Sequence, residues 1–248
     1  MMSDGGYPLV GSGKAEDALP DDDVGRWGAR AVLGSELVGR LYLWAELVLL
    51  YLGIPLLLYT QRQMLETWLL PILVGLGAGC TVLLWSDGSF DLCRLWKKAA
   101  FRRHLRRILW GFVPGALVVG GAFALWRPDL LLTFPRSQTD VWLALLVTYP
   151  LLSVYPQEII FRAFFFHRYR SLFPTRWGKV TASGLTFGFA HIVFANWVAP
   201  LMTAVIGVQF ALTYARTEST LQATIEHGLW GVYAFTIGLG WFVHSGAI

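Results

Sequence analysis

Long apolar stretches constrain this chain more than any other feature of its sequence. A helix needs about 20 predominantly apolar residues to cross a bilayer, and stretches near that length recur along the chain. They cover residues 37–59, 68–85, 108–126, 141–166, 180–193, 198–214 and 221–243. The sequence therefore predicts an all-α fold, a polytopic transmembrane helix bundle with about seven spans. An eighth span follows if Pro150 and Pro156 break the long fourth stretch.

The composition excludes an ordinary soluble domain. Charged residues make up 15% of the chain and hydrophobic residues 55%, whereas soluble domains carry about 25% charged residues. The mean hydropathy of the chain is +0.52. We therefore expect an integral membrane protein whose surroundings are the lipid bilayer.

Composition also divides the chain into three parts. Residues 1–35 are polar, with Asp21, Asp22 and Asp23 in a row, and predict a mobile tail with no secretory signal. Residues 36–135 hold the N-terminal transmembrane helices and a basic loop at 86–107, and residues 136–248 hold the remaining spans. Cys80 and Cys93 lack metal-ligand spacing, so we expect free thiols.

Positive charges set the expected orientation. The basic loop contains Arg94, Lys97, Lys98, Arg102, Arg103, Arg106 and Arg107, and the positive-inside rule puts such a loop in the cytoplasm. Alternation of the spans then predicts a cytoplasmic N-terminus, and only Arg62, Arg127 and Arg136 of the 20 Lys and Arg residues fall outside. We expect a bacterial plasma membrane, contact of the loop with anionic lipid, and no nucleic-acid partner.

Ionisable residues within the apolar stretches mark a candidate site, because each is costly to insert into a bilayer, by roughly 2.5–3.5 kcal/mol. The most specific pattern is Gln157-Glu158-x-x-x-Arg162. Glu158 and Arg162 lie one helical turn apart, so the two charges share a face and can pair. Taken alone, the pair could equally be an ion pair that only fixes the helix register.

Two histidines add to this candidate site. His191 ends a pattern in which Gly184 and Gly188 favour close helix contact. His227 lies beside Gly228, while Glu226 points about 100° away around the helix, and we expect Glu226 to be solvated. A single histidine in an apolar helix is more often a hydrogen-bonded core residue than a catalyst. Two histidines with a carboxylate indicate acid–base chemistry inside the bilayer.

The order Glu158-x-x-x-Arg162, Phe187-x-x-x-His191 and a late His227 resembles the CPBP family over about residues 140–240. This family comprises CAAX prenyl endopeptidases and bacteriocin-processing or self-immunity proteins, and is also called Abi. The resemblance implies an intramembrane glutamic-type endopeptidase with about eight helices and a catalytic core at 136–248. In the family, a Glu and a His activate a water, and a later His and an Asn stabilise the oxyanion.

Two positions depart from the family pattern. The first motif usually reads Glu-Glu-x-x-x-Arg with the first Glu as base, and this chain has Gln157 there. The last motif usually ends in Asn or Asp, and this chain has Gly231. Asn196 is a candidate replacement for the missing oxyanion donor. We expect a rotated helix that gives Glu158 the role of base, with Gln157 orienting water or donating to the oxyanion.

The predicted catalytic set is therefore Glu158, Arg162, His191, His227 and Gln157, acting on a membrane-anchored or lipidated protein without a cofactor. In this set Glu158, assisted by His191, deprotonates a water, and His227 stabilises the oxyanion. Zinc held by Glu158, His191 and His227 is a minor alternative, although the usual His-Glu-x-x-His spacing is missing. Two functions without proteolysis stay open as well. One is a catalytically inactive membrane immunity or scaffold protein, and the second is a proton-coupled transporter, although the chain lacks an internal repeat.

Overall fold

The computed structural model describes residues 36–99 and 101–243. The chain divides into two units, Met1–Tyr42 and Leu43–Ile248. Residues 36–42 of the first unit are helical, and the predicted tail at 1–35 lies outside the described residues. The described part of the second unit is built from helices and contains no strand. The all-α prediction is confirmed.

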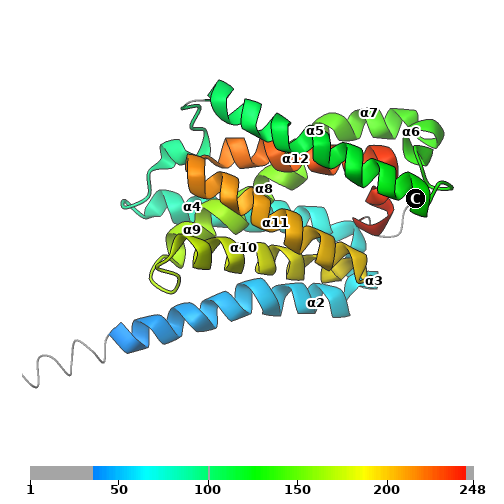
Figure 1. Ribbon diagram of the computed structural model, residues 1–248. Helices are drawn as coiled ribbons and strands as arrows, with labels where there is room; N and C mark the ends of the chain where they lie inside the picture. The colour runs from blue at the N-terminus through cyan, green and yellow to red at the C-terminus, as the bar shows by residue number, and fades with distance from the viewer. Residues whose placement is uncertain (1–35, 100, 244–248) are drawn as a thin grey trace, which may run out of the picture. The chain divides into compact units, whose positions relative to one another are not determined.

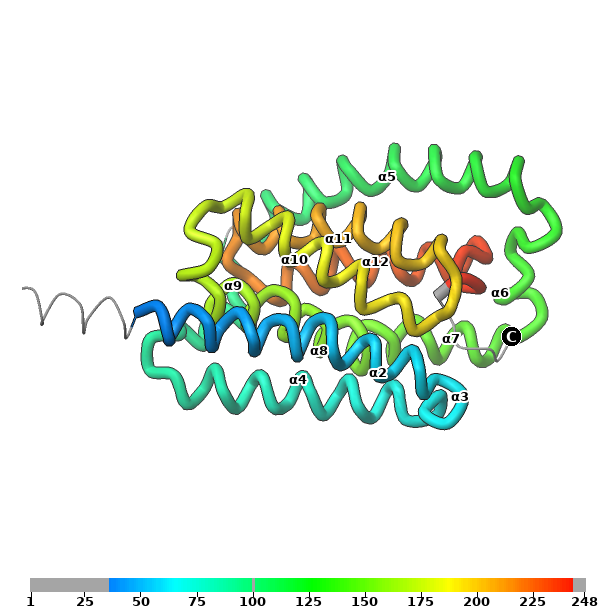
Figure 2. The backbone as a smooth tube through the Cα atoms, turned by 90° about the horizontal axis from the view of Figure 1, so that it is seen from below, coloured from blue at the N-terminus to red at the C-terminus, as the bar shows by residue number. Residues whose placement is uncertain are grey.

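Helices in the second unit follow the apolar stretches of the sequence. The α-helices are α2 (Ile54–Thr60), α3 (Arg62–Leu65), α4 (Leu69–Ser86), α5 (Phe101–Trp126), α6 (Thr133–Ser137), α7 (Thr139–Thr148), α8 (Tyr155–Glu158), α9 (Phe165–Arg168), α10 (Arg176–Ala190), α11 (Val198–Thr217) and α12 (Thr220–Ile237). Short 3-10 stretches lie at Glu66–Trp68, Leu92–Leu95, His191–Phe194 and Leu239–Val243. In Figure 1 and Figure 2, α9 lies at one end of this unit, and α3 and α6 lie at the other.

Five helices of the described residues are long and apolar enough to cross a membrane. They are Glu36–Thr60, Arg62–Ser86, Phe101–Trp126, Thr139–Arg168 and Val198–Thr217. The predicted stretches at 180–193 and 221–243 also form helices, α10 and α12, but neither meets the same criterion. α10 has 15 residues, and α12 carries the polar side chains of Gln222, Glu226 and His227.

The helix Thr139–Arg168 is continuous, so the proline break that would add an eighth span is not present in it. Within it, α7, α8 and α9 alternate with two π-helical stretches, Tyr149–Val154 and Ile159–Phe164. Proline lacks a backbone N–H and disrupts the regular α-helical ladder. Here Pro150 lies inside a π-helical stretch and Pro156 lies in the first turn of α8 after it, and the changed hydrogen-bond pattern of a π-turn accommodates both.

Helices α10 and α11 pack closely against each other. Gly184 and Gly188 lie against the backbone of Val208 and Ala204, where a Cβ atom on either glycine would overlap the neighbouring helix. Gly207 on α11 lies in the same way against the ring of Phe187. The close contact expected from Gly184 and Gly188 is therefore confirmed, and it fixes Phe187 and the following His191 against α11.

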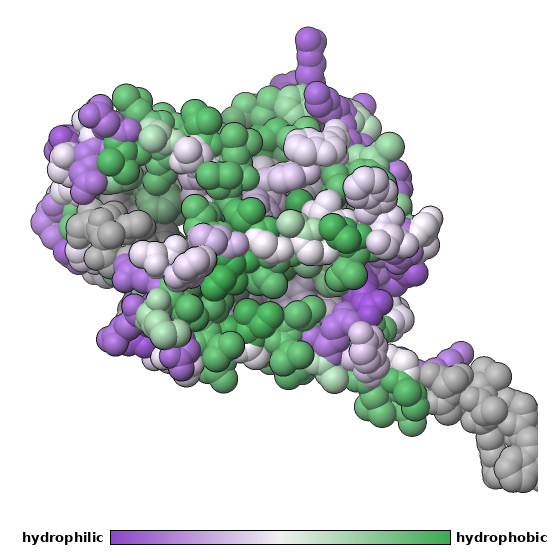
Figure 3. Space-filling view, turned by 180° about the vertical axis from the view of Figure 1, so that it is seen from behind, coloured by the Kyte–Doolittle hydropathy of each residue, from purple (hydrophilic) through white to green (hydrophobic). Residues whose placement is uncertain are grey.

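Apolar side chains cover much of the outer surface. Large exposed hydrophobic residues include Leu117, Val118 and Leu125 on α5 and Val205 on α11. Figure 3 shows apolar side chains over the middle of one face and hydrophilic side chains toward its ends. Water would not favour such a surface, whereas lipid tails would cover it. The protein is a membrane protein.

The predicted basic loop is shorter than expected, because residues 101–107 already belong to α5. The remaining segment contacts the turn between α11 and α12. Arg94 and Lys97 pair with Glu218 at 3.2 and 3.6 Å, and the Ser219 hydroxyl donates to the Lys97 carbonyl. Of the two cysteines, Cys80 is half-buried and Cys93 exposed, and both are free thiols, as predicted.

Candidate active site

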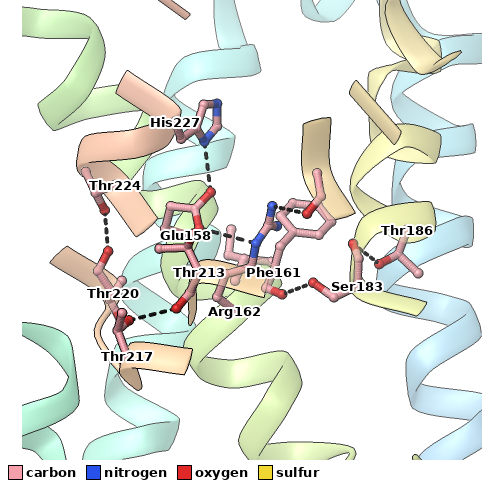
Figure 4. Close-up of polar contacts among 12 residues, drawn as sticks. Glu158, Phe161, Arg162, Ser183, Thr186, Thr213, Thr217, Thr220, Thr224 and His227 are labelled. Carbon is pink, nitrogen blue, oxygen red and sulfur yellow. Dashed lines mark hydrogen bonds and ion pairs between the residues drawn. The ribbon is translucent and has the colours of Figure 1, made fainter. Parts of the chain in front are cut away.

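Glu158 lies at the centre of a buried polar cluster (Figure 4). Its Oε1 accepts a hydrogen bond from His227 Nδ1 at 2.8 Å, and its Oε2 pairs with Arg162 Nε at 3.3 Å. The side chains of Glu158 and Arg162 have no exposed surface. The pairing predicted from their spacing is present, and α12 brings His227 to the same carboxylate.

Several neutral groups help to hold the buried cation of Arg162. Its Nη2 donates to the Gly207 carbonyl at 3.2 Å. The guanidinium carbon lies 4.6 Å from the ring centroid of Phe187 and 5.8 Å from that of Phe210, and aromatic faces attract cations. A buried charge needs such partners to offset its lost hydration.

The partners of His227 define which of its nitrogens carries the proton. A carboxylate oxygen only accepts hydrogen bonds, so Nδ1 carries the proton and Nε2 of the neutral ring has a lone pair. The Tyr149 hydroxyl lies 3.4 Å from this Nε2. Phe210 stacks on the imidazole, with centroids 4.6 Å apart and an angle of 17° between the planes. The ring of His227 is thus held at Nδ1 and on one face, and the Tyr149 hydroxyl makes a long contact with Nε2.

His191 lies directly after α10, at the start of a 3-10 stretch. Its Nδ1 donates to the Phe187 carbonyl at 2.7 Å. Because a carbonyl only accepts, Nδ1 carries the proton and Nε2 keeps a lone pair. The residue lines a cavity of about 530 Å³, and its unprotonated Nε2 can accept a proton from a water held there.

Polar groups are few in this cavity, which is lined mainly by apolar side chains. They include Gln157, Ser153, Tyr149 and His191. The Gln157 amide donates to the Ser153 hydroxyl at 2.9 Å. Glu158, Arg162 and His227 are not among the lining residues.

The structure therefore divides the predicted catalytic set into two groups. Gln157 and His191 line the cavity, and Glu158, Arg162 and His227 form a buried cluster outside its lining. Tyr149 connects the two groups, because it lines the cavity and its hydroxyl lies 3.4 Å from His227 Nε2.

Residues 137–233 match a family model described as Type II CAAX prenyl endopeptidase Rce1-like. The matched segment runs from just before the long helix Thr139–Arg168 through most of α12. This segment of the chain is therefore similar to the CAAX prenyl endopeptidase family. The matched segment contains every residue of the predicted catalytic set, so the resemblance to CPBP proteins is confirmed. No curated protein and no solved structure matches the chain.

The CAAX prenyl endopeptidases are in general intramembrane proteases, and the family also has inactive members. A membrane protein acts in a lipid bilayer, and a peptide is the general substrate of this family. Zinc ligation is not favoured by the side chains present. Within residues 36–99 and 101–243, no group of three His, Cys, Asp or Glu side chains lies close enough together to hold a metal ion.

Two expectations about other residues of the matched segment were wrong. Glu226 is buried rather than solvated, with 3% of its surface exposed, because it faces α11 and accepts a hydrogen bond from Gln209 at 2.7 Å. Asn196 is not a spare oxyanion donor. Its amide donates to the carbonyls of Phe194 and Phe242, and its Oδ1 accepts from the Ala199 N–H.

Tyr149 is the polar residue that the sequence analysis missed. Tyrosine is common in apolar helices, so its presence alone gave no signal. The useful signal was its position, since Tyr149, Ser153 and Gln157 recur at intervals of four residues before the motif. Such spacing places polar side chains along one face of a helix.

Proposed function

We propose that the CAAX prenyl endopeptidase domain hydrolyses a peptide bond of a membrane-anchored or lipidated protein, using a water bound beside His191. One observation carries this proposal. His191 lines the cavity while its Nδ1 proton is engaged by the Phe187 carbonyl, so Nε2 is free to act as an acceptor. A base held in one tautomer beside a cavity is the arrangement that general-base catalysis requires.

In the proposed reaction, His191 Nε2 takes a proton from the water while the water oxygen attacks the peptide carbonyl carbon. The carbonyl oxygen becomes an oxyanion, and the C–N bond then breaks as the protonated His191 returns the proton to the leaving nitrogen. Water thereby adds OH to the carbonyl carbon and H to the nitrogen. No cofactor is required for this balance.

Glu158 contributes through His227 in this proposal. Both of its carboxylate oxygens face protein groups, and its side chain has no exposed surface. The assignment of the base to Glu158, made from the sequence, stays a prediction. The geometry gives more support to His191 as the group that contacts the water, with Glu158 fixing the orientation of His227.

The cavity favours an extended and largely apolar substrate segment. Its volume of about 530 Å³ falls in the range of small-molecule and peptide-residue sites. Helical peptides hide their carbonyls in internal hydrogen bonds, so the scissile segment must be unwound where it meets His191. The apolar lining also suits a lipid chain attached to the substrate.

The test compares the termini of membrane proteins in cells that produce the native chain and the His191→Asn variant at equal levels. Asparagine can keep an N–H donor near the Nδ1 position while removing the Nε2 acceptor. The matched control is His104→Asn on α5, because His104 does not line the cavity. We expect a set of new termini that depends on His191 and is unaffected by the change at His104.

Glu158→Ala is a less suitable variant for this comparison. It leaves the Arg162 guanidinium buried without its carboxylate, and breaking a buried pair in this way destabilises a protein by about 3–5 kcal/mol. Loss of activity would then reflect unfolding. Identical termini from the native chain and folded His191→Asn would contradict proteolysis and favour the inactive immunity or scaffold role.

A further inference from the structure

Tyr149 packs against the face of α12 that carries His227. His227, Gly231 and Phe235 are four residues apart and therefore share this face. The Tyr149 ring packs edge-on against Phe235, with centroids 5.2 Å apart, and against His227 at 6.3 Å. Gly231 lies between these two contacts, so the tyrosine covers the position that departs from the family pattern.

Gly231 and Tyr149 depend on each other sterically. A Cβ atom at position 231 would overlap the hydroxyl and ring atoms of Tyr149. Any larger side chain at 231 therefore excludes the tyrosine from its present position. The phenol hydroxyl occupies the volume that a side chain from position 231 would fill.

The hydrogen-bond roles at His227 also point to the tyrosine. Because Glu158 holds the Nδ1 proton of His227, Nε2 of the neutral imidazole can accept but cannot donate. The Tyr149 hydroxyl is the donor in this pair. Its separation of 3.4 Å from Nε2 is at the long limit of a hydrogen bond, so its O–H is weakly held and can turn toward the cavity.

We propose that Tyr149 is a catalytic residue that donates a hydrogen bond to the oxyanion formed during peptide hydrolysis. The proposal rests on the proposed function and adds a role to the same site. Tyr149 and His191 line one cavity, so the carbonyl oxygen can contact the hydroxyl while the water contacts His191 Nε2. The phenol keeps its proton throughout, and the hydrogen bond strengthens as negative charge develops on the carbonyl oxygen.

The first test is Tyr149→Phe in the purified full chain, reconstituted in phosphatidylcholine vesicles. The probe is a quenched fluorescent peptide copied from a cleavage site found by the terminus comparison. Removing one oxyanion donor lowers kcat by about 100- to 1,000-fold, and we expect that loss with little change in KM. The control is Tyr155→Phe, because Tyr155 stacks on Trp96 and lines a different cavity.

A second variant tests the exchange of positions directly. Tyr149→Ala should be as slow as Tyr149→Phe or slower. Adding Gly231→Asn to Tyr149→Ala places an amide donor in the vacated space, and we expect kcat to rise at least about 10-fold, a part of what one oxyanion donor contributes. Gly231→Asn alone should inactivate the protein, because Tyr149 already fills that space.

Each of the following results would overturn the role of Tyr149. Folded Tyr149→Phe with the native kcat would do so while leaving the proposed function intact. A rise in KM at constant kcat would assign the hydroxyl to substrate binding instead. If kcat of the double variant is no higher than that of Tyr149→Ala, the Tyr149 hydroxyl does not replace a donor from position 231. If the native chain cleaves nothing in the terminus comparison, the proposed function fails and the donor role fails with it.

Discussion

Gln157 and Glu158 are adjacent in the sequence but meet different surroundings. Glu158 points into the buried cluster with Arg162 and His227, whereas Gln157 lines the cavity and donates to Ser153. Neighbouring residues on a helix point about 100° apart, so one site cannot receive both side chains. The family carboxylate at position 157 would therefore lie in the cavity that His191 also lines.

This placement predicts that Gln157→Glu increases the rate of peptide hydrolysis. A positioned general base contributes about 10²–10⁴-fold, and a carboxylate in the cavity that His191 lines would share that task, so we expect kcat to rise by at least about 10-fold. Initial rates with the quenched peptide in vesicles measure the effect. Gln157→Met, similar in size and uncharged, is the control and should give no increase. A Gln157→Glu rate at or below the native rate would show that the cavity cannot use a carboxylate there.

The sequence predicted some of these residues and missed others for physical reasons. The Glu158–Arg162 pair follows from local spacing, since an interval of four residues brings two side chains together on any helix. Tyr149 and Gly231 belong to different helices, so their contact depends on tertiary packing that local periodicity does not contain. For Glu226, the helical angle showed only that it points away from His227. That it faces Gln209 required the position of α11.

At the scale of elements, the long helix Thr139–Arg168 determines which side chains reach the cavity. Its two π-helical stretches flank α8, which carries Gln157 and Glu158. A π-turn inserts an extra residue and rotates the following helix about its axis, and such turns occur frequently at functional sites. The prolines indicated an irregularity at the right place. They did not distinguish a helix break from a π-turn, because both accommodate a proline that has no backbone N–H to donate.

The contact of α10 with α11 gives a prediction about stability. Gly188→Ala adds a methyl group against the Ala204 backbone, and overpacking of this kind destabilises proteins by about 1–3 kcal/mol. Because α10 positions Phe187 and His191, cleavage should fall as well. The free energy of unfolding in detergent micelles measures the first effect, and peptide cleavage measures the second.

Gly111→Ala on α5 is the matched control for this change. A Cβ atom there meets nothing within 4 Å, and alanine favours a helix over glycine by about 1 kcal/mol. The control should therefore be neutral or slightly stabilising. Equal effects of the two substitutions would mean that the space between α10 and α11 does not limit their packing.

At the scale of the whole molecule, the apolar stretches predicted where the helices lie. They did not predict which of these helices are apolar enough to cross the membrane. Helices that face lipid are apolar all round, so hydropathy identifies them directly. α10 and α12 face the interior site, and α12 replaces apolar positions with Gln222, Glu226 and His227. Hydropathy therefore identifies the helices that carry the site less clearly than it identifies α5.

The distribution of charge predicts the orientation of the protein in its membrane. Cys93 is exposed in the basic segment before α5, and exposed Ser137 lies at the end of α6, beyond the next span. The positive-inside rule places the first position in the cytoplasm and hence the second outside. In a Cys80→Ala background, a membrane-impermeant maleimide should label Cys93 in inverted vesicles and not in intact cells. With Cys93→Ser and Ser137→Cys, labelling should occur in intact cells instead. Labelling of Cys93 from outside would reverse the topology and would place the segment between α9 and α10, at the same end of the helices, on the outer surface.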